Sequence, residues 1–341
     1  EVLKYTGKQN LSGDVREKAV KYLDTAYENN NDDLYRKNSI NEITTEDKIK
    51  EIKLDNILIG GVIRLYPINE YLIIEDYKSL DKQIHIFNKK EFKHITSIAK
   101  KGQGPGEVAN IGYIGIDEVN RRFYVSDHGK QKIFIYQIDS IILNPSYMPQ
   151  TKMKMDEKLF PSEYTYINDT LCIGRIIKPI GNTDYKPFIA KWNMNTEEIK
   201  PMKYENKKIE KKRINFALSK EYSIYAECYN NYDLITICDI NGNLRYNIYG
   251  PNWSYSPNKN SYYNNAIFCK DRLVVSFIGD DKDSYLPNKL IVFNTTGDYI
   301  KTLKTGYNIS NFCFDKENNR IIMSLDDTIQ LAYLDLNEIL N

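Results

Sequence analysis

The side chains best known for catalysis do not fall into any familiar catalytic or metal-binding pattern in this chain. The three histidines, His85, His94 and His128, show neither HExxH nor another ligand spacing, so they predict no zinc site. No GxSxG segment is present, so a serine nucleophile on a strand-to-helix turn is unsupported. The sequence therefore predicts no catalytic residues, no metal ligands and no cofactor.

The cysteines also argue against a metal centre. They are five in number, which is odd, and no two form a CxxC pair, so neither a zinc site nor a dense disulfide framework is expected. Each lies in or beside an apolar, strand-like run, which predicts buried free thiols. They are Cys172, Cys228, Cys238, Cys269 and Cys313.

A glycine-rich stretch at residues 100–107 is the strongest local motif. Three of the 17 glycines fall within five residues, at Gly102, Gly104 and Gly106. The spacing is neither GxxxxGK[ST] nor GxGxxG, and residues 111–116 read as a strand rather than a helix, so phosphate binding at a helix N-terminus is unsupported. The motif predicts a tight crossing between two β units. A loop that faces a ligand is the alternative.

The elements that would position these residues repeat along the chain. Short apolar strands follow polar turns, and their marker residues lie 52, 48, 52, 50 and 48 residues apart. Two of the turns, at residues 117–122 and 315–320, share the pattern Asp-x-x-Asn-x-Arg, which suits a hairpin. Six units of about fifty residues predict an all-β, six-bladed β-propeller of four-stranded antiparallel blades. The markers are Leu72, Tyr124, Cys172, Ile224, Val274 and Ile322.

Two segments lie outside the regular repeat. Apolar residues between 15 and 26 follow helical spacing, so residues 1–47 are expected to form an N-terminal helical appendage that ends in a polar connection. The sixth unit lacks a fourth strand, whereas residues 48–54 alternate and belong to no complete unit. We expect this segment to complete the last blade and close the ring, so that residues 48–341 form the propeller.

The segment at residues 101–107, KGQGPGE, followed by FYVSD at residues 123–127, resembles the TolB-like six-bladed β-propeller family, which is common in Bacteroidetes. Val108 departs from the Phe often found after the motif, and the resemblance covers roughly residues 50–335. It implies a six-bladed ring on a secreted or lipid-anchored protein, with a signal peptide and an anchor upstream of Glu1. It supplies no catalytic residues.

A propeller usually presents its site at one mouth of the channel, where the inner strands begin. Aromatic side chains with polar tips at such positions suit sugar or peptide recognition, whereas packing along the channel is the structural alternative. Acidic residues are sparse there, which disfavours a calcium-dependent propeller of the gluconolactonase type. The candidate ligand-binding residues are Arg64, Tyr113, Tyr164, Asn215, Asn265 and Asn311.

Composition and charge narrow the function classes. Lys and Arg number 47 against 46 Asp and Glu, so no overall field favours nucleic acid, and no apolar run of 18 residues predicts a transmembrane helix. These observations favour a monomeric, non-enzymatic binding propeller of the cell envelope, a periplasmic or outer-membrane lipoprotein with a protein or glycan partner. The alternative is a metal-dependent hydrolase or lyase with its site in the channel. A third hypothesis is a scaffold that docks through its N-terminal helix.

Overall fold

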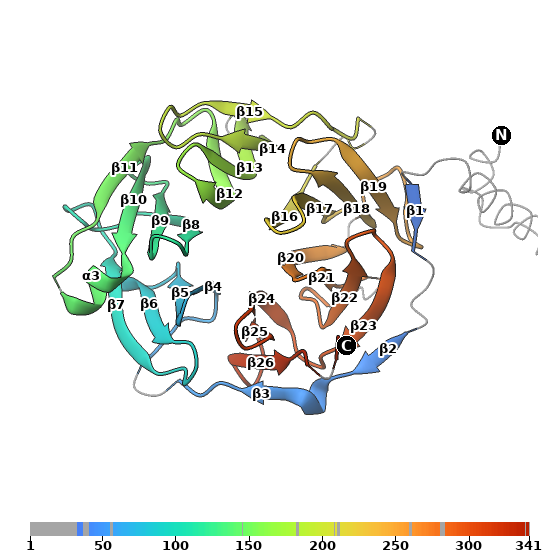
Figure 1. The fold of residues 1–341 in the computed structure, drawn as a ribbon, viewed down its shortest axis with the longest axis horizontal. Coiled ribbons are helices and arrows are strands. Elements are labelled where there is room, and N and C mark those ends of the chain that lie inside the picture. Colours follow the sequence, from blue (N-terminus) through green and yellow to red (C-terminus); the bar gives the residue numbers. More distant parts are fainter. Residues whose placement is uncertain are drawn as a thin grey trace, which may run out of the picture.

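The computed structural model shows a six-bladed β-propeller, with six sheets arranged in a ring (Figure 1). Each blade has four antiparallel strands, as the repeat predicted, and two blades carry an additional parallel strand. Among the residues described, no helix has the length and apolar character needed to cross a membrane. The structure describes residues 33–36, 41–54, 57–144, 146–181, 184–207, 209, 212–258, 261–279, 284–337 and 339–340. The helix expected between residues 15 and 26 lies outside this part.

The first three blades follow one another along the chain. Blade 1 consists of β4 (Ile63–Ile68), β5 (Tyr71–Asp76), β6 (Lys82–Asn88) and β7 (His94–Lys100). Blade 2 consists of β8 (Ile111–Asp117), β9 (Arg122–Asp127), β10 (Lys132–Gln137) and β11 (Gln150–Lys154), with the helix α3 (Ile138–Leu143) before its last strand. Blade 3 consists of β12 (Phe160–Asn168), β13 (Leu171–Ile180), β14 (Asp184–Trp192) and β15 (Ile199–Pro201).

The last three blades also receive strands from the N-terminal part of the chain. Blade 4 consists of β16 (Ile214–Ser219), β17 (Ile224–Tyr229), β18 (Leu234–Asp239), β19 (Leu244–Tyr249) and β1 (Asp33–Tyr35). Blade 5 consists of β20 (Tyr263–Cys269), β21 (Arg272–Phe277), β22 (Lys289–Asn294), β23 (Tyr299–Lys304) and β2 (Glu42–Thr44). Blade 6 consists of β24 (Ile309–Asp315), β25 (Arg320–Leu325), β26 (Leu331–Asp335) and β3 (Ile49–Glu51).

The core lies between neighbouring blades, because each sheet packs its two faces against the next blade on either side. All residues of β17 and of β25 are buried, which explains why these second strands are nearly continuous apolar runs rather than alternating ones. The inner strands β4, β8, β12, β16, β20 and β24 are the sheet edges that line the channel. Positions on these inner strands therefore decide what the channel presents to a ligand.

Residues 33–36 and 41–51 lie along the outside of blades 4, 5 and 6 (Figure 1). β1 pairs in parallel with β19, β2 pairs in parallel with β23, and the short 3-10 helix η1 (Glu46–Lys48) leads into β3. We expected a polar connection up to about residue 47, so the two parallel strands are a difference from the sequence analysis. They form because the outermost strand of each blade leaves backbone groups unpaired, and the passing segment satisfies them.

The strand β3 is the outermost strand of blade 6, where it pairs antiparallel with β26. Beyond β3, the backbone N–H of Ile52 donates to the carbonyl oxygen of Leu331 at 2.8 Å. The Ile52 side chain is buried in a cluster that includes Leu65 of blade 1 and Ile322 of blade 6. One sheet thus contains strands from both ends of the propeller.

All five cysteines are free and buried, as predicted from their apolar surroundings. Burial raises the pKa of Cys172 and of Cys238 to about 12 in each case, so both thiols stay protonated at neutral pH. They act as small apolar core residues.

The glycine-rich motif connects β7 of blade 1 to β8 of blade 2, as expected. The Glu107 carboxylate folds back and accepts a hydrogen bond from the Gly104 backbone N–H at 2.8 Å. A Cβ atom at Gly102 would lie 2.1 Å from Glu107 Oε2, so the motif is glycine-rich partly to make room for that carboxylate. Lys130 Nζ donates to the carbonyl oxygens of Gly104 and Glu107, each at 2.7 Å, and holds the crossing against blade 2.

Replacing Gly106 by alanine should lower the free energy of unfolding by about 1–2 kcal/mol, because φ at Gly106 is +71°, where an L side chain is strained. Chemical denaturation of the purified variant measures this effect. Gly61→Ala is the matched control, since a Cβ there meets no atom within 4 Å and should change stability little. Equal stability of the two variants would contradict the argument that the positive φ at position 106 requires glycine.

Candidate binding site in the central channel

A cavity of about 550 Å³ occupies the central channel and is lined by the inner strands of all six blades. This volume lies in the range of small-molecule sites. All six residues selected from the sequence line it. Their function as ligand-binding residues stays a prediction.

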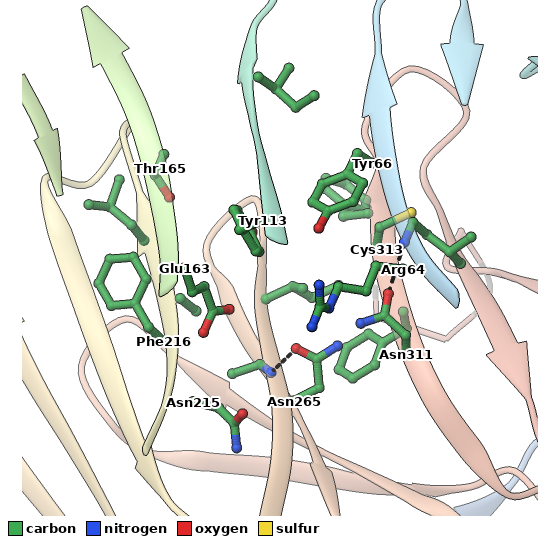
Figure 2. Close-up of a pocket in the computed structure, with 18 of the residues that line it drawn as sticks. Arg64, Tyr66, Tyr113, Glu163, Thr165, Asn215, Phe216, Asn265, Asn311 and Cys313 are labelled. Carbon is green, nitrogen blue, oxygen red and sulfur yellow. Dashed lines mark hydrogen bonds between the residues drawn. The ribbon is translucent and has the colours of Figure 1, made fainter. Parts of the chain in front are cut away.

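These residues occupy equivalent positions near the start of each inner strand. Arg64 and Asn215 are the second residues of β4 and β16, whereas Tyr113, Asn265 and Asn311 are third because their strands contain a register irregularity. In blade 3 the equivalent residue is Glu163, which lies opposite Arg175, while Tyr164 lies opposite Gly174 and is almost fully buried. We call this set the upper ring; it consists of Arg64, Tyr113, Glu163, Asn215, Asn265 and Asn311 (Figure 2).

Glu163 and Arg175 are thus site residues that the sequence analysis missed. An irregularity in β12 between Pro161 and Glu163 shifts the strand by one position, so Glu163 rather than Tyr164 takes the ring position. The only available signal was Glu163 itself, an acidic residue in a strand of otherwise uncharged residues.

Arg64 is fixed by a carboxylate behind it. Its Nη1 donates to Glu75 Oε1 at 2.8 Å, and the Tyr66 hydroxyl donates to Glu75 Oε2 at 2.8 Å. Glu75 is fully buried, whereas the Arg64 side chain is 42% exposed to the cavity. Although desolvation opposes it, the Glu75 carboxylate raises the pKa of Arg64 above its ordinary value. Arg64 is therefore a permanent, oriented positive charge in the channel (Figure 2).

The corresponding pair in blade 3 has the opposite polarity. Glu163 projects from the inner strand, and Arg175 lies opposite it on β13, with 3.5 Å between Glu163 Oε2 and Arg175 Nη2. Arg175 also donates through Nε to Ser162 Oγ at 3.0 Å and through Nη1 to the carbonyl oxygen of Ile214. Desolvation raises the pKa of Glu163 in spite of Arg175 and Arg64, which both favour its charged form.

Tyr113 lies between Arg64 and Glu163, as Figure 2 shows. Its ring meets Tyr66 edge-on with 5.2 Å between centroids, and the Tyr164 ring lies 5.7 Å away on the other side. Burial raises the pKa of Tyr113, and the nearby Glu163 carboxylate adds to the effect. The neutral hydroxyl is a hydrogen-bonding group on the cavity wall.

The asparagines of the upper ring have structural partners as well. Asn215 Nδ2 donates to the carbonyl oxygen of Tyr263 at 3.0 Å, which joins blades 4 and 5. Asn311 Oδ1 accepts from the Leu65 backbone N–H at 3.1 Å, which joins blades 6 and 1, and Asn265 Oδ1 accepts from the Ala266 N–H at 2.8 Å. Part of their hydrogen-bonding capacity therefore holds the ring together, in line with the packing alternative.

Below the upper ring the cavity wall becomes apolar. Three residues after each ring position comes a proline, aliphatic or aromatic side chain, and each of these lines the cavity. We call this set the apolar belt; it consists of Pro67, Ile116, Tyr166, Leu218, Phe268 and Phe314. The cavity is thus polar at the end where the inner strands begin and apolar in its middle section.

Three charged residues lie where the inner strands of blades 2, 4 and 6 end. Glu118, Lys220 and Lys316 each directly follow an inner strand, and all three line the cavity. Lys316 Nζ lies 3.2 Å from Glu118 Oε2, but both side chains are substantially exposed, at 65% and 42%. An exposed pair of this kind contributes at most about 1 kcal/mol, so it is easily broken.

The histidines take structural positions. The Nδ1 atom of His85 and the Nε2 atom of His94 both lie 2.8 Å from Ser97 Oγ, and burial lowers the pKa of His85 to about 4. His128 packs against Phe160 with 5.3 Å between ring centroids. Within the described ranges, no three or more His, Cys, Asp or Glu side chains come together as a metal site would require.

Comparisons with known proteins agree with this architecture. A family model, DUF5128, described as "6-bladed beta-propeller", matches residues 47–160. A search of the curated proteins finds no match.

Several solved structures share the fold at low sequence identity. A member of the duf4221 family from Bacteroides vulgatus has a TM-score of 0.57 and 14% identity, over 84% of this chain and 97% of that chain. A luciferin-regenerating enzyme has a TM-score of 0.55 and 10% identity, over 84% and 94%. The β-propeller domain of Cps50 (Swd1) from Myceliophteria thermophila has a TM-score of 0.51 and 9% identity, over 84% and 98%. At such low sequence identity these similarities indicate the fold and nothing more. The chain is a six-bladed β-propeller.

Proposed function

We propose that this protein is a non-enzymatic binding propeller of the bacterial cell envelope that holds a small polar ligand, or a polar group of a glycan or peptide partner, in its channel. The TolB-like resemblance supports the envelope location and the lipid anchor upstream of Glu1. The polar upper ring and the cavity of about 550 Å³ support the binding function.

The observation that carries the proposal is the preorganised guanidinium of Arg64. Glu75 engages only Nη1, and no hydrogen bond from Nε or Nη2 to another described residue accompanies it. A side chain that is already oriented loses little entropy when a ligand binds, so these two nitrogens suit an anionic or strongly polar group.

The metal-dependent hydrolase or lyase is the rival function. Glu163 is the one carboxylate of the upper ring, and the neighbouring Arg64 repels a divalent cation, so this donor set suits a metal poorly. Metal analysis of the purified protein tests this rival. Calcium or zinc held in stoichiometric amounts would favour the enzyme and overturn the non-enzymatic proposal.

Exchanging Arg64 and Glu75 together for glutamine should weaken ligand binding while the propeller stays folded. The double change is needed because removing Arg64 alone leaves Glu75 buried without its counter-charge. Calorimetry would be run on the full chain with ligands selected from a thermal-shift panel of neutral sugars, uronic acids, amino acids and short peptides. We expect affinity to fall roughly 10- to 100-fold, as for losing one hydrogen bond to a charged group.

Arg245→Gln is the matched control, because it removes one exposed arginine on β19, away from the cavity. It should bind as the unmodified chain does. A panel in which no ligand binds, or in which binding ignores the Arg64/Glu75 exchange, would contradict the proposed function. Immunoblotting of cell fractions tests the location, and recovery in the cytosol would refute it.

A further inference from the structure

The two charged pairs of the channel are built on the same register with reversed polarity. In blade 1, Arg64 on the inner strand lies opposite Glu75 on the second strand; in blade 3, Glu163 on the inner strand lies opposite Arg175. In blade 1, Arg64 reaches the upper ring and the buried Glu75 stands behind it, whereas in blade 3 both Glu163 and Arg175 line the cavity, with side chains 15% and 25% exposed. The cavity therefore has a positive group, Arg64, and a negative group, Glu163, on either side of Tyr113 (Figure 2).

The four charges of the two pairs sum to zero. A simple anion near Arg64 would therefore be repelled by Glu163 and Glu75, and a simple cation near Glu163 would be repelled by Arg64 and Arg175. A molecule with charges of both signs, aligned between Arg64 and Glu163, is attracted at both ends and leaves the site neutral. The electrostatic arrangement selects a dipolar ligand over either ion.

The hydrogen-bonding groups that remain available in the two pairs also favour a dipolar ligand. Arg175 is engaged by protein atoms through Nε, Nη1 and Nη2, whereas Arg64 uses only Nη1 within the part of the chain described. Glu163 meets Arg175 at 3.5 Å, longer than a well-formed hydrogen bond, so its carboxylate is incompletely neutralised. The upper ring thus offers a cationic donor at Arg64 and an acceptor at the Glu163 carboxylate, which besides Arg175 also has a hydrogen bond with the Phe216 backbone.

The apolar belt determines the rest of the ligand. Side chains such as Ile116, Leu218, Phe268 and Phe314 lie three residues beyond the charged and amide positions and cannot hydrogen-bond a polar group. A ligand with its charged groups at the upper ring therefore places an apolar portion against the belt, where burial is favourable.

We infer that the ligand is a zwitterion with an apolar side chain, namely an apolar α-amino acid or a short peptide of such residues. The ligand carboxylate binds Arg64, its ammonium binds Glu163, and its side chain packs against the apolar belt. This inference rests on the proposed function, since it names the ligand class for the same cavity.

The test uses calorimetry on the unmodified full chain with L-phenylalanine, L-leucine and the dipeptide Leu-Phe as probes. The matched analogues are 3-phenylpropionate, which lacks the ammonium, 2-phenylethylamine, which lacks the carboxylate, and glycine, which lacks the side chain. We expect at least one zwitterionic probe to bind, and each analogue to bind roughly tenfold or more weakly, as expected when a hydrogen bond to a charged group is lost.

The isosteric change Glu163→Gln tests the contribution of the negative group independently of Arg64. It should weaken L-phenylalanine roughly tenfold and leave 3-phenylpropionate unchanged or stronger, with Arg245→Gln as the control for charge. Equal binding of L-phenylalanine and 3-phenylpropionate to the unmodified chain would overturn the inference. So would binding of sugars or uronic acids with no binding of the three probes, although the proposed function would then stand. If no compound binds, both fail.

Discussion

Deleting residues 48–54 should yield protein that aggregates or that unfolds without a cooperative transition. These residues include β3, which supplies the outer strand of blade 6, and Ile52, which is buried between blades 6 and 1. Without them, β26 becomes an exposed edge, and the first and last blades lose a shared apolar cluster. Size-exclusion chromatography and thermal unfolding followed by circular dichroism measure the outcome.

A point substitution tests the same contact between blades 6 and 1 with less disruption of the fold. Ile52→Asp places a charge in the cluster beside Leu65 and Ile322 and should be strongly destabilising, whereas Lys53→Asp, at the next and exposed position, should be tolerated. A soluble, monomeric deletion variant with a sharp unfolding transition would show that the ring closes without this strand.

Asp233→Ala should lower the free energy of unfolding by about 3–5 kcal/mol, the range for breaking a buried ion pair by removing one partner. Asp233 Oδ1 lies 3.1 Å from Arg36 Nη2 and accepts from the Tyr263 hydroxyl at 2.7 Å. Both charged side chains are almost fully buried, at 3% and 0% exposure, so the variant leaves Arg36 without its counter-charge away from water. Urea denaturation gives the value.

The ion pair also attaches the N-terminal segment to the propeller, because Arg36 directly follows β1. Removing both charges, in Arg36→Met/Asp233→Asn, should recover a large part of the loss, since no lone charge stays buried. Asp81→Ala, at an exposed position, is the control and should change stability by less than about 0.5 kcal/mol. A double variant as unstable as Asp233→Ala would indicate that the lost contacts matter more than the unpaired charge.

The repeat of about fifty residues was sufficient to predict the six-bladed architecture, because each blade is patterned by its own local sequence. The turn at Asp117 shows this locality: Asp117 Oδ2 accepts from Asn120 Nδ2 at 2.9 Å and from Arg122 Nε at 2.7 Å. Asp315 makes the same two bonds in blade 6 with Asn318 and Arg320, within a stretch of six residues. Interactions between residues this close in sequence can be predicted from the local sequence pattern.

The candidate site was only partly accessible to the same reasoning. Counting from the start of each inner strand brought six residues to one cavity, but an irregularity in β12 replaced Tyr164 by Glu163 at the ring position. A one-residue shift of this kind depends on how the strand pairs with its neighbour, which no local pattern records. The reversed polarity of the two charged pairs became visible only with this register.

By itself, the sequence determined the fold class, the number of blades, the connection at residues 100–107 and the region of the channel mouth, since all of these follow from local periodicity and turn chemistry. Tertiary structure alone decided which distant groups meet. Arg36 and Asp233 are separated by 197 positions, and Glu118 and Lys316 by 198. Closing a ring brings such residues together through the packing of whole blades, and the identity of each contact then depends on register and burial rather than on neighbours in the chain.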